Sequence, residues 1–206
     1  MPRRAAALLL AALLGAGCAQ LGRGRAVPEC PGELVASEAI PGEFLLRERW
    51  SVERGGETFP LEVVAQKRAD ELVLVGLHPL GARLFALRQR GLATQVEAEA
   101  PSPALEVPPG NVLRDLHRAR FLAVEARGTD GVFSEQRGGS EIRERREAGR
   151  VRERSFRRLA GDPPGLVVVR FGEPTPGGSA PARIEIENGW CGYRAEVTTL
   201  SEQVLR

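Results

Sequence analysis

The stretch Leu72–Leu87 reads LVLVGLHPLGARLFAL, in which two apolar runs flank the residues His-Pro-Leu-Gly at 78–81. Short apolar runs bounded by proline and glycine are typical of two strands joined by a turn. Pro79 pre-sets φ for a turn, and Gly81 tolerates the positive φ that a tight loop requires. We therefore expect a hairpin with Leu80 at its tip, where this large side chain either folds back onto the sheet or stays exposed.

The hairpin lies within a longer series of alternating segments. Residues of one face recur at every second position in the segments 44–52, 59–65 and 92–98, and they are apolar except for Glu48 and Thr94. Alternation with a period of two is the pattern of a strand that buries one face. Short turns separate the segments, so we expect five consecutive strands in an antiparallel meander.

The rest of the chain predicts one helix and further strands, and therefore an α+β fold. Asn111 is a candidate helix cap, and an apolar stripe at helical spacing follows it: Val112, Leu113, Leu116 and Ala119. A helix this short is unstable alone, so it must cover the inner face of the meander. Residues 140–149, where acids and bases alternate, predict a short exposed helix. Strands are expected at 151–159, 166–171, 183–187 and 193–197.

The first residues have the layout of a secretory signal peptide. Two arginines precede the apolar run 5–14, which is too short to span a bilayer, and small residues lead to Cys18. A cysteine at this place resembles the signals of bacterial lipoproteins, in which it is lipidated. Leu14 stands one position too early for the usual lipobox, so cleavage near Gly17 to give a secreted protein is the alternative. We expect a signal peptide at 1–17, a lipidated tether at 18–32 and a folded domain at 33–206.

The residues around the cysteines predict a location and a disulfide. Ala19 stands where an Asp would retain a lipoprotein at the inner membrane, so we expect the periplasmic face of the outer membrane. Of the three cysteines, Cys30 and Cys191 remain once Cys18 is lipidated. An even pair in an oxidising compartment predicts a disulfide, with two buried free thiols as the alternative.

Charge and motifs argue against nucleic-acid binding and catalysis. Lys and Arg number 29 against 27 Asp and Glu, a balance that a dedicated nucleic-acid binder does not show. The two histidines, His78 and His117, lack a metal-ligand spacing. The sequence contains no nucleophile elbow and no phosphate-binding glycine loop. We therefore expect no enzyme, no metal and no cofactor.

A curved sheet covered only by a short helix should leave an apolar cavity on its inner face. Such a cavity suits an acyl chain or another apolar ligand. The residues expected to line it are Phe44, Trp50, Leu61, Val63, Leu74, Leu84 and Val168.

The order of these elements resembles the LolA and LolB families. The most specific match is Pro79-Leu80-Gly81 between the third and fourth strands, where the LolB family has a Pro-Leu-Gly turn. The resemblance implies an incomplete antiparallel β-barrel with a short helical lid over a hydrophobic cavity. It also implies that Leu80 is a membrane-inserting residue, and that a periplasmic carrier protein delivers acylated lipoproteins to the chain. Residues 127–150 depart from the LolB pattern.

A family of uncharacterised bacterial lipoproteins of LolB-like fold is also similar, at 76–85, at 112–116 and at Gly192-Tyr193. Its members are often encoded among genes for aryl polyene or fatty-acid-like lipid synthesis. We therefore predict a monomeric outer-membrane lipoprotein that binds acyl chains and takes part in lipoprotein or lipid transfer. The alternatives are a carrier for another apolar product, such as an aryl polyene lipid, and a structural envelope lipoprotein without ligand.

Overall fold

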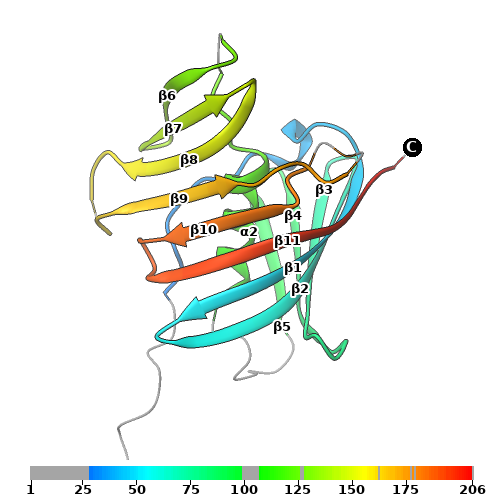
Figure 1. The fold of residues 1–206 in the computed structure, drawn as a ribbon. Helices are drawn as coiled ribbons and strands as arrows, with labels where there is room; N and C mark the ends of the chain where they lie inside the picture. Colours follow the sequence, from blue (N-terminus) through cyan, green and yellow to red (C-terminus); the bar gives the residue numbers. More distant parts are fainter. Residues whose placement is uncertain are drawn as a thin grey trace, which may run out of the picture.

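One antiparallel sheet contains most of the described chain (Figure 1). The computed structural model describes residues 28–98, 107–125, 128–161, 163–176, 178 and 180–205. Within these residues the sheet has 11 strands in the order β5-β4-β3-β2-β1-β11-β10-β9-β8-β7-β6. The expected signal peptide at 1–17 and the lipidation site Cys18 lie outside the described residues.

The strands follow the chain in two runs that meet in the middle of the sheet. The elements are η1 (Ser37–Ala39), β1 (Phe44–Arg54), β2 (Glu57–Arg68), β3 (Glu71–Leu77), β4 (Arg83–Arg90), β5 (Ala93–Ala98), α2 (Pro109–Arg120), β6 (Gly131–Arg137), β7 (Ser140–Glu147), β8 (Arg150–Arg158), β9 (Leu166–Phe171), β10 (Arg183–Asn188) and β11 (Tyr193–Val204). Strands β1 to β5 are sequential neighbours, which confirms the predicted meander. The last strand, β11, returns to pair with β1 and joins the two runs.

The sheet curls around α2, which lies on its concave face (Figure 1). The predicted apolar stripe of this helix is buried, and Val112, Leu113 and Leu116 are each at most 2% exposed. Among the described residues, the fold is therefore an incomplete antiparallel barrel with one α-helix inside it, as predicted. The predicted cap was wrong, because the helix begins at Pro109, whose missing N–H costs nothing in the first turn. Asn111 lies inside the helix and is fully buried.

Residues 140–149 are not a helix. They form β7 and the turn after it, and β6 pairs with β7 at the edge of the sheet. Burial alternates along β7, so that Ile142 and Glu144 face inward while Arg143 and Arg145 face out. In β7 every second residue faces inward, as in any strand that buries one face. One of these inward residues is a glutamate, a residue type that is seldom buried, so the sequence does not show the apolar face that would have predicted a strand.

The β3–β4 turn presents Leu80 to solvent. The chain reverses through two backbone hydrogen bonds, from His78 to Ala82 and from Gly81 to His78, each 2.7 Å long. Gly81 adopts a φ of 89°, the positive value expected of it. Leu80 is 89% exposed, so it does not fold back onto the sheet.

The start of the described chain is held tightly to the domain. A disulfide joins Cys30 to Cys191 in the β10–β11 turn, and Cys30 is 1% exposed. Asn111 of α2 accepts a hydrogen bond from the N–H of Cys30 and donates one to the carbonyl of Pro28. The disulfide and these hydrogen bonds attach the end of the expected lipidated tether, residues 28–32, to the domain.

We expect the double substitution of Cys30 and Cys191 by Ser to lower the free energy of unfolding by about 2–5 kcal/mol. The reason is that the bond joins residues 161 apart and so restricts nearly the whole unfolded chain. Urea unfolding of the two proteins measures the difference, and reduction of the wild type should reproduce it. Equal stabilities, or two free thiols in the unfolded and unreduced wild type, would contradict this prediction.

Candidate functional site

The residues predicted to line a cavity under the first strands are packed instead. Trp50, Leu61, Val63, Leu74 and Leu84 are each at most 8% exposed and share one core with the apolar stripe of α2. Phe44 is half-buried at the edge of this core, where its ring lies 6.0 Å from that of Phe121. This part of the concave face is therefore covered by the protein's own helix.

Val168 does not face the concave side. The burial pattern of β9 alternates, so that Val167 and Val169 are fully buried whereas Val168 is only half-buried. A continuous apolar strand carries no alternation from which its inner face can be chosen, and this is why the prediction was wrong by one position.

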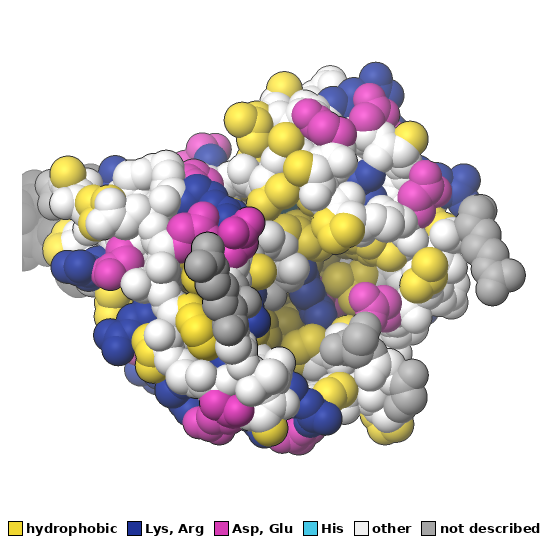
Figure 2. Space-filling model, turned by 90° about the horizontal axis from the view of Figure 1, so that it is seen from above, with side chains coloured by type: hydrophobic (Ala, Val, Ile, Leu, Met, Phe, Trp, Pro, Cys, Tyr) yellow, Lys and Arg dark blue, Asp and Glu magenta, His cyan; other side chains and the backbone are white. Residues whose placement is uncertain are grey.

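An open hollow lies farther along the concave face, over β8 and β9. It has a volume of about 400 Å³, and its lining is Arg150, Val151, Arg154, Phe171, Gly172, Pro174 and Pro181. A bulge in β8 sets Val151 opposite Arg146 and Glu153 opposite Arg145, which turns Val151 to the same side as Arg154. The view from above shows the molecule hollowed near its centre, with hydrophobic and basic side chains in its depth (Figure 2).

The floor of this hollow contains a buried ionic cluster. Glu144 is fully buried and accepts hydrogen bonds from Arg154 Nε at 2.7 Å and from Arg146 Nη2 at 2.8 Å. It also accepts a hydrogen bond from the backbone N–H of Val124. The guanidinium of Arg154 stacks 5.4 Å from the ring of Phe171, and its Nη1 donates to the carbonyl of Arg118 in α2. Burial lowers the pKa of Arg154.

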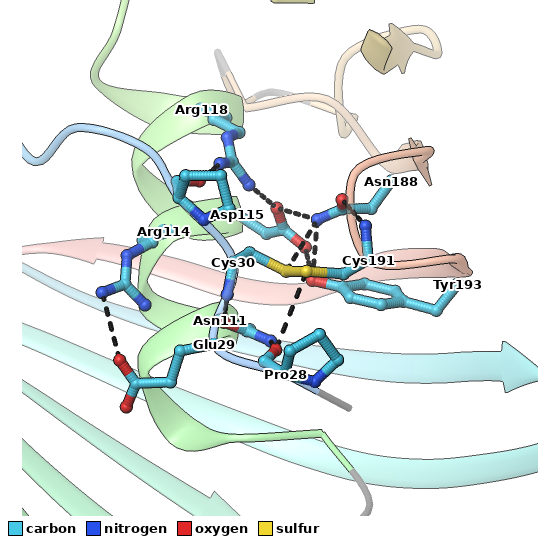
Figure 3. Close-up of a disulfide and its surroundings, with 11 residues drawn as sticks. Pro28, Glu29, Cys30, Asn111, Arg114, Asp115, Arg118, Asn188, Cys191 and Tyr193 are labelled. Carbon is cyan, nitrogen blue, oxygen red and sulfur yellow. Dashed lines mark hydrogen bonds and ion pairs between the residues drawn. A yellow bond between two sulfur atoms is a disulfide. The ribbon is translucent and has the colours of Figure 1, made fainter. Parts of the chain in front are cut away.

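Two further polar clusters fix α2 against the sheet. In the first, Glu48 accepts hydrogen bonds from the indole of Trp50 and from the guanidinium of Arg120. In the second, Asp115 is bonded to Arg118, Asn188 and Tyr193 beside the disulfide (Figure 3). Burial and the Asp115 carboxylate raise the pKa of Tyr193. These clusters orient the helix. The one sign of them in the sequence was Glu48, a charged residue on the otherwise apolar face of the segment 44–52.

Both histidines make hydrogen bonds within the folded protein. His117 is fully buried on α2, where its Nδ1 accepts the N–H of Val35 at 2.9 Å and its Nε2 meets Gln89 Oε1 at 2.9 Å. His78 accepts the N–H of Leu80 within the β3–β4 turn. In the described part of the chain, no three His, Cys, Asp or Glu side chains lie close enough to bind a metal ion. Among those same residues, no helix has the length and apolarity needed to cross a bilayer.

Comparison with known proteins agrees with this architecture. A family model described as "Protein of unknown function (DUF3261)" matches residues 45–201. No curated protein matches the chain by sequence. A LolA superfamily protein from Nitrosomonas europaea superimposes with a TM-score of 0.51 at 13% identity, over 83% of this chain and 90% of that chain. An outer membrane lipoprotein-sorting protein domain, so described, from Vibrio parahaemolyticus gives 0.46 at 11% identity, over 82% and 88%. The first likeness confirms the LolA-like fold.

Stability should fall as the pH falls below 6.5, because burial lowers the pKa of His117 from 6.5 to about 3. The unfolded chain then binds a proton that the folded chain excludes, which costs about 1.4 kcal/mol per pH unit until the folded pKa is reached. Urea unfolding at several pH values should show this slope in the wild type and in His78→Gln, and a shallower slope in His117→Gln. Equal slopes in all three proteins would contradict this interpretation.

Proposed function

The chain belongs to the DUF3261 family of proteins of unknown function, and we propose that it is an outer-membrane lipoprotein that binds acyl chains and takes part in lipid or lipoprotein transfer. The hollow over β8 and β9 is the observation that carries the proposal, because it gives the concave face an accessible apolar surface. Pockets of about 300–1,000 Å³ are typical of small-molecule sites. In this proposal the protein acts by binding alone and is not an enzyme.

The position of the β3–β4 turn supports the proposal that one end of the sheet faces the membrane. The β1–β2, β3–β4 and β10–β11 turns all lie at the same end of the antiparallel sheet. The disulfide fastens Cys30 to the last of these turns, and the start of the described chain lies on the same lower side in Figure 1 as the β3–β4 turn. Twelve residues separate Cys30 from Cys18, a reach of about 40 Å when fully extended.

A lipid on Cys18 would therefore keep Leu80 within reach of the bilayer. In this proposal Leu80 inserts into the membrane, and a ligand leaves the hollow for the lipid phase. The short tether ends at the disulfide and therefore restricts the orientation of the domain relative to the bilayer. A longer flexible segment would let the domain rotate away.

A carrier for a smaller apolar product is the second candidate, and the size of the hollow favours it. A volume of about 400 Å³ lies near the lower end of ligand pockets, which suits one hydrocarbon chain better than the several chains of an acylated lipoprotein. The two candidates differ in the ligand and share the apolar surface of Val151 and Phe171.

Replacing Leu80 by Glu should weaken binding of the mature chain, made without its lipid, to phospholipid vesicles by about tenfold or more. The side chain is 89% exposed, so the melting temperature should not change. Leu92→Glu is the matched control, because Leu92 is 64% exposed at the opposite end of β4. Co-sedimentation measures vesicle binding. Unaltered binding of Leu80→Glu, or equal losses in the two variants, would remove the membrane role of Leu80.

A further inference from the structure

The arginines of the hollow are more numerous than the acids that face them. On its floor, Arg146 and Arg154 share the single carboxylate of Glu144. The side chains of Glu144 and Arg154 are 0% and 5% exposed and that of Arg146 is 20% exposed, so water screens this imbalance only in part. A buried group with one positive charge in excess is unfavourable unless a partner supplies a negative charge.

At the rim of the hollow, Arg150 is the arginine that lines the opening. Arg150 and Arg152 both bind Glu173, at 2.7 and 2.6 Å, and Arg152 also lies 3.7 Å from Glu147. Glu147 also pairs with Arg145, which faces out from the sheet, so two arginines face two glutamates near the rim. The excess of positive charge therefore lies in the buried cluster at Glu144.

One N–H donor group of Arg154 has no hydrogen-bond partner among the described residues. Its Nε and Nη1 are engaged by Glu144 and by the carbonyls of Arg118 and Ala119. Its Nη2 makes no hydrogen bond to any described residue, and Arg154 forms part of the lining. Val151, Phe171, Pro174 and Pro181 line the same space, so a cation and an apolar wall lie side by side.

Building on the proposed function, we propose that the ligand is a single-chain amphiphile with one negatively charged end, a fatty carboxylate, whose head binds Arg154 at the floor while its chain lies against Val151 and Phe171. One negative charge balances the excess on the floor. A hydrogen bond between two charged groups away from water is stronger than one between neutral groups, so the charged head should dominate selectivity. Arg150 at the rim attracts the anion as it enters.

Dodecanoate and 1-dodecanol test this proposal, because they share a chain and differ in charge. Calorimetry on the mature chain, with its disulfide formed, should give about tenfold tighter binding of dodecanoate than of dodecanol. The preference should shrink toward unity in Arg154→Met, which leaves Glu144 paired with Arg146, and should grow in Glu144→Gln. Acetate, which has the charge without the chain, should bind at least a hundredfold more weakly than dodecanoate.

Surface variants keep the test decisive if a floor variant does not fold. Arg150→Gln should lower the preference for dodecanoate about twofold to threefold, whereas Arg157→Gln on the same strand should leave it unchanged. These side chains are 54% and 61% exposed, so both proteins should fold. Equal binding of the two ligands by the wild type would overturn this inference and leave the proposed function standing. Binding of neither ligand would overturn the proposed function itself.

Discussion

The structure depends on how a strongly curved sheet buries its concave face. A barrel of 11 strands that stays open leaves apolar side chains facing inward, and water must be kept from them. Only a helix of 12 residues and the segment before β1 are available among the described residues to do this. The helix shares one core with Trp50 and Leu74 and also with Val169, and it leaves only the start of β8 and the end of β9 open. The hollow is what remains when a short helix covers a large sheet.

Charged residues hold this arrangement in one orientation. A 12-residue helix resting on an apolar surface has many nearly equivalent positions, and apolar contact alone selects poorly among them. Glu48 binds Arg120 near the C-terminal end of α2, and Asp115 binds Asn188 and Tyr193 from its middle. Buried ion pairs add little net stability because desolvation offsets their attraction, but a wrong orientation would leave each charge unpaired. The clusters therefore select one position of α2 on the sheet, and this position determines the shape of the hollow.

Much of the fold could be predicted from period-two patterns and turn residues. The meander, the strand 166–171 and the β3–β4 turn depend on local sequence, and each is in the structure. Local sequence left open whether Leu80 folds back or stays exposed, and the structure shows it exposed. Two features depend on partners distant in the chain and could not be predicted. Glu144 is an inward residue of β7 only because Arg146 and Arg154 neutralise it, and Asn111 is buried because it binds the backbone of Pro28 and Cys30. Most of the residues predicted to line a cavity are packed in the core with α2, and the hollow lies elsewhere, since no pattern indicates how far along a sheet a helix reaches.

In the function proposed above, a hydrocarbon chain enters the hollow over β8 and β9 and stays out of the core beneath β1 to β4. A fatty acid with a nitroxide on its chain, added to the mature protein, measures this directly through the broadening of nearby nuclear resonance signals. We predict broadening at Val151 and Phe171, with the signals of Leu61 and Leu74 unaffected. Broadening centred on Leu61 and Leu74, or at no residue of the concave face, would contradict it.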